Sequence, residues 1–162
     1  DPEMSRGLGD VYKRQISDDA LKVADYNKKY NNADYIKLIK SDMFSSSECE
    51  QYKNEDNRFD VIVSNPPYIP TKDIDELSEE VRLHDPVLAL DGDTDGLKFY
   101  KAITKQSVNY LKENGYLCYE IGYNQAEDVR NIMEQCGYSG IKVIKDLAGL
   151  DRVVIGRLNN IN

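Results

Sequence analysis

The sequence predicts an α/β fold with a mostly parallel sheet that ends in an antiparallel hairpin. Three observations predict it. Helix and strand patterns alternate from Ile16 onward. Residues 59–64 are rich in apolar β-branched side chains, which is typical of a strand covered on both faces of a parallel sheet. The last two predicted strands, 141–144 and 153–158, are separated by about eight residues, too few for a helical crossover, so we expect them to pair as a hairpin.

The first 15 residues differ from the rest of the chain. They lack apolar periodicity, and the run from Gly7 to Gln15 resembles translated sequencing-adaptor read-through. We interpret residues 1–15 as a non-native or disordered segment and leave them out of the fold. A disordered native amino terminus is the alternative interpretation. Residues 16–162 then make one domain of ordinary size.

The elements before residue 65 follow from capping and periodicity. Ser17 is a candidate N-cap, and Asp18 and Asp19 suit the first turn of a helix that runs to about Tyr30. An alternating apolar pattern predicts a short strand at 35–40. A polar loop at 45–57 separates it from the strand at 59–64.

The elements after residue 70 are predicted in the same way. Residues 73–83 suggest a short helix, and 86–96 an irregular loop. An apolar stripe predicts a helix over 96–111, which Asn114 and Gly115 would end. A buried strand at 116–121 and a helix at 125–135 precede the hairpin.

Composition limits the classes of function. The formal net charge of −8 disfavours a protein that holds long nucleic acid, because neutralising phosphates requires Lys and Arg. The sequence has no apolar run long enough for a membrane span and no signal-peptide pattern, so we expect a cytoplasmic protein without membrane contact. We also expect a monomer. No metal site is expected: the three cysteines form no CxxC pair, and the calcium-loop-like run at 91–96 has Ala102 where a bidentate Glu is needed.

The most informative motif is Asn65-Pro66-Pro67-Tyr68. It directly follows the strand at 59–64, at the end of the strand where open α/β sheets bind ligands. Asn65 and Pro66 each precede a proline and are restricted to extended backbone, and the prolines have a fixed φ and no N–H. The loop is therefore stiff and presents carbonyl oxygens beside an amide side chain and an aromatic ring.

This arrangement suits a planar NH2 group, whose nitrogen is a weak nucleophile because its lone pair is delocalised. If the two hydrogens are donated to the Asn65 side-chain oxygen and the Pro66 carbonyl, the lone pair can be aimed at an electrophilic methyl group. Stacking on Tyr68 would fix the plane of the group. Asn65, Pro66 and Tyr68 are thus the candidate catalytic residues, and Pro67 completes the candidate substrate-binding loop.

The motif is part of a longer ordered series that covers nearly all of residues 16–158. It resembles the HemK/PrmC family, which methylates the glutamine of the Gly-Gly-Gln motif in peptide chain release factors. The series consists of Ser41-Asp42-Met43-Phe44, Ser64-Asn65-Pro66-Pro67-Tyr68-Ile69-Pro70, Val81-Arg82-Leu83-His84-Asp85-Pro86, Ala89-Leu90-Asp91-Gly92, Asp95-Gly96-Leu97, Tyr100, Glu120-Ile121-Gly122, Gln125 and Asp151-Arg152-Val153.

The resemblance implies a Rossmann-like methyltransferase fold, S-adenosyl-L-methionine as cofactor and a release factor as protein partner. It also implies that residues 65–68 bind the substrate glutamine and that Asn65 lies beside the cofactor. Asp42 would accept a hydrogen bond from the adenine amine of the cofactor. Met43 would pack on the adenine ring, where relatives often have an aromatic residue.

The sequence departs from the family pattern before Ile16. The glycine-rich cofactor loop is missing, and Gln15 stands where an acidic residue would bind the cofactor ribose. The amino-terminal helical domain of the family is also missing. We therefore expect a partial catalytic domain, truncated upstream and without the first strand in the middle of its sheet, that binds cofactor weakly and has little activity.

Other interpretations remain open at this point. A nucleic-acid methyltransferase acting on an exocyclic amine of adenine or guanine could use the same motif after flipping its base. An inactive fragment could serve as an interaction module, and a polyproline turn could bind an SH3- or WW-like domain. Glu120 could approach the cofactor or lie at the surface, and His84 is expected to be structural.

Overall fold

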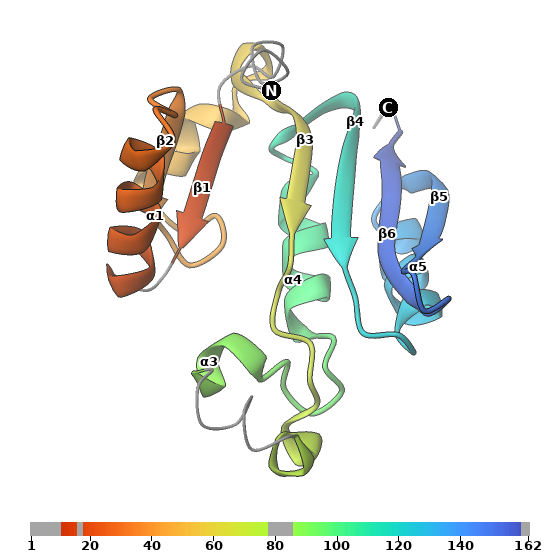
Figure 1. Ribbon diagram of the computed structural model, residues 1–162. Coiled ribbons are helices and arrows are strands. Elements are labelled where there is room, and N and C mark those ends of the chain that lie inside the picture. Colours follow the sequence, from red (N-terminus) through yellow and green to blue (C-terminus); the bar gives the residue numbers. More distant parts are fainter. Residues whose placement is uncertain (1–10, 16–17, 78–85, 160–162) are drawn as a thin grey trace. The chain divides into compact units, whose positions relative to one another are not determined.

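The computed structural model describes residues 11–15, 18–77 and 86–159 (Figure 1). The chain divides into two compact units, Asp1–Gln51 and Tyr52–Asn162. Within the described residues, each unit contains its own sheet, of two strands in unit 1 and four in unit 2. The predicted α/β class is confirmed.

The described residues of unit 1 include a parallel pair of strands and an α-helix. These elements are β1 (Val11–Gln15), α1 (Asp18–Tyr30) and β2 (Ile36–Lys40), and β1 pairs with β2 in parallel. The helix and the second strand lie where the sequence predicts them. The strand β1 differs from the prediction, because the segment 1–15 was expected to have no regular structure. Its residues 11–15 form ladder pairs with β2, whereas residues 1–10 lie outside the described part of the chain.

Unit 2 is a mixed four-stranded sheet with helices. Its strands are β3 (Phe59–Ser64), β4 (Leu111–Glu120), β5 (Tyr138–Lys145) and β6 (Asp151–Leu158). The sheet order is β3-β4-β6-β5. β3 and β4 are parallel, and β6 pairs antiparallel with both β4 and β5, so the predicted terminal hairpin is confirmed. The second strand of that hairpin lies between β4 and the first (Figure 1).

The helical elements are α3 (Val87–Leu90), α4 (Lys98–Ser107), α5 (Ala126–Gln135) and the 3-10 turns η1 (Ser47–Lys53), η2 (Glu55–Asn57) and η3 (Thr71–Glu76). The predicted helix at 125–135 is confirmed. The helix predicted at 73–83 is a 3-10 turn in its first part, and the rest, like His84, lies outside the described residues.

The boundary between α4 and β4 corrects a prediction. The helix was expected to reach Leu111, but that residue begins β4 and pairs with Phe59. Leu111 is fully buried, and the Phe59 N–H donates to the Tyr110 carbonyl at 2.8 Å. Tertiary pairing therefore overrides the helical pattern. The Asn114 turn, with a φ of +64°, becomes an irregularity within β4, where the register with β3 shifts.

One face of the four-stranded sheet carries the core of unit 2. Ladder pairs place its buried members on the same face: Ile62, Leu117, Tyr119, Tyr138, Val154 and Leu158. Helix α4 reaches this face through a Thr104–Tyr119 hydroxyl pair at 2.8 Å and a Ser107–Tyr138 pair at 2.6 Å.

The opposite face of β3 is open, which corrects the expectation of a strand covered on both faces. Val61 and Val63 are 49% and 75% exposed, whereas Ile62 between them is 8% exposed. The hydroxyl contacts of Thr104 and Ser107 on α4 lie on the Ile62 face of the sheet. The β-branched residues therefore predict a strand at this position, but they do not show whether one or both of its faces are covered.

The buried hydroxyl pair of Thr104 and Tyr119 makes a testable contribution to stability. Both residues are at most 1% exposed, so removing one hydroxyl leaves the other in an apolar core. We expect Thr104→Val and Tyr119→Phe each to lower the free energy of unfolding by about 1–2 kcal/mol. Urea unfolding of both variants and of the double variant measures the coupling. The double variant should lose less than the sum of the two single losses, and strict additivity would contradict the pairing.

Candidate active site

The candidate acceptor loop, residues 65–68, begins where β3 ends. Asn65 is exposed, Pro66 is buried, and Pro67 and Tyr68 are half-buried. The loop thus lies at the carboxyl edge of the parallel β3–β4 pair. The polar side chain faces solvent at the position where the sequence predicts the substrate nitrogen to bind.

Main-chain hydrogen bonds attach Ile69, which follows the acceptor loop, to residues 90–92. The Ile69 N–H donates to the Leu90 carbonyl at 3.0 Å, and the Gly92 N–H donates to the Ile69 carbonyl at 2.8 Å. These bonds create an isolated parallel bridge between Ile69 and Asp91. The exit of the acceptor loop is therefore attached to the segment that precedes α4.

Two glycines of that segment lie against the main chain of Tyr68. A Cβ at Gly92 would lie 2.9 Å from the Tyr68 Cα, and one at Gly96 would collide with the Tyr68 carbonyl oxygen. Gly96 also has a φ of +71°, which glycine adopts without strain. Gly92 and Gly96 therefore allow their segment to lie directly against the main chain of Tyr68.

The carboxylates of Asp93 and Asp95, in the same segment, pair with neighbouring lysines. Asp93 lies 2.9 Å from Lys98, whose side-chain hydrogen bond is the main reason that the pKa of Asp93 falls to about 2. Asp95 pairs with Lys101 at 2.6 Å, and this contact lowers the pKa of Asp95. Among the residues that the structure describes, no group of three or more His, Cys, Asp or Glu side chains could hold a metal ion.

The end of β4 is fixed by a buried tyrosine of α4. The Tyr100 hydroxyl donates to the Glu120 carbonyl at 2.9 Å, and the Tyr100 ring meets the Tyr119 ring edge-on. Burial raises the pKa of Tyr100 far above its usual value, so its hydroxyl keeps its proton and acts as a donor. Tyr100 therefore holds the last residue of β4 beside the acceptor loop's edge of the sheet.

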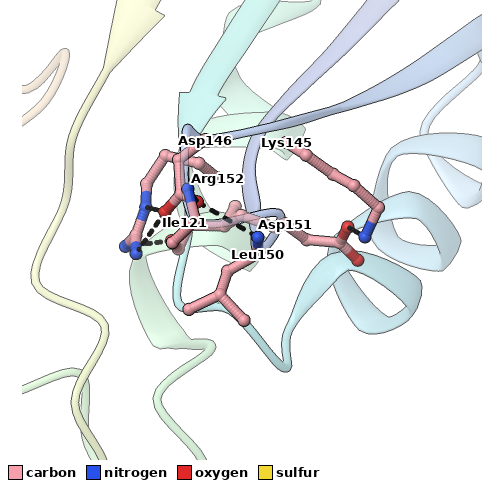
Figure 2. Close-up of polar contacts among 7 residues, drawn as sticks. Ile121, Lys145, Asp146, Leu150, Asp151 and Arg152 are labelled. Carbon is pink, nitrogen blue, oxygen red and sulfur yellow. Dashed lines mark hydrogen bonds and ion pairs between the residues drawn. The ribbon is translucent and has the colours of Figure 1, made fainter.

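The β5–β6 hairpin reaches the same edge, as Figure 2 shows. Asp146 Oδ1 accepts hydrogen bonds from the N–H groups of Ala148 and Leu150, and its Oδ2 accepts from the Arg152 guanidinium at 3.1 Å. Arg152 Nη1 also donates to the Ile121 carbonyl at 3.3 Å. The Asp146 carboxylate raises the pKa of Arg152, and Tyr68 and Glu120 act on it electrostatically as well. This cation therefore connects the hairpin to the segment that follows β4.

The predicted cofactor residues lie in unit 1, directly after β2. Asp42 is exposed and Met43 is half-buried, with a φ of +49° that is uncommon for a residue other than glycine. The turn around them is compact, because the Ser46 N–H donates to the buried Ser41 hydroxyl at 3.0 Å and the Ser45 N–H donates to the Asp42 carbonyl at 3.0 Å. Asp42 and Met43 are therefore adjacent residues of one hydrogen-bonded turn.

The structure thus brings Asn65, Pro66, Pro67 and Tyr68 together on one loop of unit 2, and Asp42 and Met43 together on one turn of unit 1. Gln125 and Arg152 belong to the series that carries the family resemblance, but no role for them or for Asp146 follows from the sequence. Gln125 Nε2 donates to the Tyr68 carbonyl at 3.0 Å. The available sequence signal was a polar residue at the start of a predicted helix, which does not identify a partner 57 residues away.

Comparisons with known proteins agree on the class of protein. A family model described as Eco57I restriction-modification methylase matches residues 8–132. A release factor glutamine methyltransferase from Fusobacterium nucleatum is 40% identical over 142 residues, which are 88% of this chain and 38% of that protein. One from Clostridium acetobutylicum is 39% identical over 147 residues, which are 90% of this chain and 50% of that protein. The chain spans half or less of the length of these two relatives.

A solved structure supports the fold. A methyltransferase from Pyrococcus furiosus superposes with a TM-score of 0.65 at 18% identity, covering 93% of this chain and 63% of the other. The predicted Rossmann-like methyltransferase fold is therefore confirmed. In the described ranges, no helix is both long enough and apolar enough to cross a bilayer.

The packing of Gly96 against Tyr68 can be tested with a matched pair of variants. Gly140 also has a positive φ, of +59°, but no atom lies within 4 Å of its would-be Cβ. We expect Gly140→Ala to lower the free energy of unfolding by about 1–2 kcal/mol through backbone strain alone. Gly96→Ala should lose roughly 1–3 kcal/mol more, because its methyl group collides with Tyr68. Urea unfolding measures both, and equal losses would contradict the close approach.

The Asp146 turn predicts a pH-dependent contribution to stability. The hydrogen bonds that Asp146 accepts hold its pKa below the value of about 3.9 expected for an unfolded chain. The bond from the Leu150 N–H has the largest effect. The stabilisation is therefore present above that value and is lost as the pH falls through the folded pKa. We expect Asp146→Ala to lower the urea midpoint at pH 7 and to differ less from the wild type near pH 3.

The control is Asp151→Ala, which removes the carboxylate of a solvent-accessible pair with Lys145 in the same hairpin. Such pairs contribute little to stability, so this variant should stay close to the wild type. A constant difference between the Asp146→Ala variant and the wild type across the pH range would contradict the role of the ionised carboxylate.

Proposed function

The chain belongs to the Eco57I restriction-modification methylase family, and from this premise we propose that it methylates the side-chain amide nitrogen of a glutamine in peptide chain release factors. The observation that supports this proposal most strongly is the position of the proline-containing acceptor loop at the carboxyl end of β3. The predicted resemblance to release factor glutamine methyltransferases is confirmed by relatives of that name that are 40% and 39% identical. Because the chain spans half or less of their length, the activity and partner are proposals for the protein that contains it.

The acceptor loop would act by positioning. The two hydrogens of the substrate NH2 group would be donated to Asn65 Oδ1 and to the Pro66 carbonyl, and the amide plane would stack on the Tyr68 ring. The nitrogen lone pair would then have no hydrogen-bonding partner and would be directed at the methyl donor. As the new N–C bond formed, the bond between the methyl carbon and the sulfonium sulfur would break and leave a neutral thioether. One of the two nitrogen protons would then leave along a hydrogen bond that is already formed and pass to solvent. This route needs orientation and no strong base.

The chemistry of the Asp42 turn fits the cofactor. S-adenosyl-L-methionine would supply an electrophilic methyl group on a sulfonium sulfur. The exposed Asp42 carboxylate is a suitable acceptor for its adenine amine, and Met43 offers a half-buried thioether of the kind that packs on aromatic rings. Asn65 would lie beside the bound cofactor as well as the substrate. These assignments rest on the residue chemistry and on the resemblance of the series.

A protein substrate is favoured over nucleic acid by two observations. The formal net charge is −8, and phosphate neutralisation requires basic residues. The relatives from Fusobacterium nucleatum and Clostridium acetobutylicum, which are 40% and 39% identical to this chain, carry the release factor name. The description of the matching family model, a restriction-modification methylase, favours the rival, an exocyclic amine of a nucleic-acid base. The experiment below therefore offers both acceptors.

The test uses a hybrid protein, because the chain spans half or less of the length of the relatives that it matches. In the hybrid, the present chain replaces the matching 147 residues of the Clostridium acetobutylicum relative. Transfer of radiolabelled methyl groups is measured with an intact release factor and with an adenine-containing oligonucleotide. We expect transfer to the release factor and none to the oligonucleotide. The opposite preference would overturn the proposed substrate.

Asn65→Ala in the hybrid tests the role of the acceptor loop. Loss of one of the two oxygens that hold the nitrogen should lower kcat by roughly 100-fold or more. Asn131→Ala is the matched control, because Asn131 is an exposed asparagine on α5 that no step of the proposed mechanism uses. It should leave kcat unchanged. An unchanged kcat for Asn65→Ala would exclude the proposed positioning by its side chain.

A further inference from the structure

Gln125 joins three loops at the carboxyl edge of the unit 2 sheet. Its side chain lies just before α5 and is 7% exposed. Its Oε1 accepts a hydrogen bond from the Gly122 N–H at 3.0 Å. Its Nε2 donates to the Tyr68 carbonyl at 3.0 Å and to the Gly96 carbonyl at 3.4 Å. One side-chain amide thus contacts the segments that follow β3, precede α4 and follow β4.

The orientation of this amide follows from its partners. Gly122 offers an N–H and needs an acceptor, whereas Tyr68 and Gly96 offer carbonyl oxygens and need donors. A rotation that exchanged the oxygen and the nitrogen would place like groups against each other at all three contacts. A glutamine in the observed orientation therefore satisfies every partner, and a glutamate would face two carbonyl oxygens with a carboxylate.

The surroundings leave room for this amide and for little else. A Cβ on Gly96 would lie 2.8 Å from Gln125 Nε2, and a Cβ on Gly122 would lie 2.8 Å from Gln125 Oε1. The backbone of Gln125 is held as well, because its N–H donates to the Gly122 carbonyl and its carbonyl accepts from the Val129 N–H, both at 3.0 Å. The amide is consequently a fixed point to which the Tyr68 carbonyl is attached.

We infer that Gln125 is a positioning residue that holds the acceptor loop in its shape through the Tyr68 carbonyl; its effect on methyl transfer rests on the proposed function. Tyr68 follows Pro66 and Pro67, whose φ angles are fixed by their rings. A displacement of the Tyr68 carbonyl therefore also displaces the Pro66 carbonyl and the Tyr68 ring. Both groups belong to the proposed acceptor site, whereas Gln125 acts on them from behind.

The first experiment measures the loop itself in the 162-residue chain. Gln125→Met keeps the length of the side chain and removes its polar atoms. We expect the hydrogen exchange of the Ile69 and Gly92 amides to become about tenfold faster, and the carbonyl carbon resonance of Tyr68 to move as its donor is lost. The amide of Leu117 in the buried core of β4 should keep its protection, which shows that the fold is intact.

A matched control and a second variant complete this experiment. Gln135→Met makes the same change at the exposed end of α5 and should alter neither the exchange nor the resonance. Gln125→Glu should accelerate exchange at Ile69 at least as much as Gln125→Met, because its carboxylate repels the Tyr68 and Gly96 carbonyls. Unchanged exchange at Ile69 and Gly92 in both Gln125 variants would overturn the inference.

The second experiment separates positioning from a merely structural effect by using the hybrid described above. Gln125→Met should lower kcat for the release factor by about 10- to 100-fold and leave the KM for S-adenosyl-L-methionine within about twofold. An unchanged kcat would overturn the effect on transfer. A wild-type hybrid that methylates neither acceptor would instead contradict the proposed function, while the exchange measurements still decide the role of Gln125 in holding the loop.

Discussion

The acceptor side of this protein depends on the close approach of two stretches of main chain at Tyr68. Gly92 and Gly96 allow this approach because a Cβ at either position would collide with Tyr68. The contact attaches a loop that follows β3 to the segment that precedes α4. The prolines stiffen the loop from within, and the glycines and Gln125 fix it from outside. A site that works by orientation requires both kinds of constraint.

The central strand β4 connects this loop to the core. β4 is parallel to β3 and antiparallel to β6, so its carboxyl end meets both the acceptor loop and the tip of the hairpin. Tyr100 holds the Glu120 carbonyl there, and Arg152 holds the Ile121 carbonyl. Polar contacts from a helix and from a hairpin therefore converge on the same edge of the sheet. The core that supports them is packed on the Ile62 face of that sheet.

The two units divide the proposed chemistry. Unit 2 carries the residues that are proposed to bind the acceptor nitrogen, and unit 1 carries Asp42 and Met43, which are proposed to bind the methyl donor. Each group lies in the turn or loop that directly follows a parallel strand, β3 in one case and β2 in the other. This is the general location of ligand sites in open α/β sheets. The positive φ of Met43 has no counterpart in the sequence analysis, because a methionine gives no sign of a left-handed backbone.

The sequence by itself predicted the strand at 59–64, the helix at 125–135 and a stiff loop after the strand, because each depends on the residues within the segment. Only the tertiary structure decided that Leu111 begins β4, that β6 lies between β4 and β5, and that Gln125 contacts Tyr68. These features depend on hydrogen bonds and burial between segments far apart in the chain. Dihedral preferences are local and can be read from neighbours, whereas sheet order and side-chain partners are settled by packing.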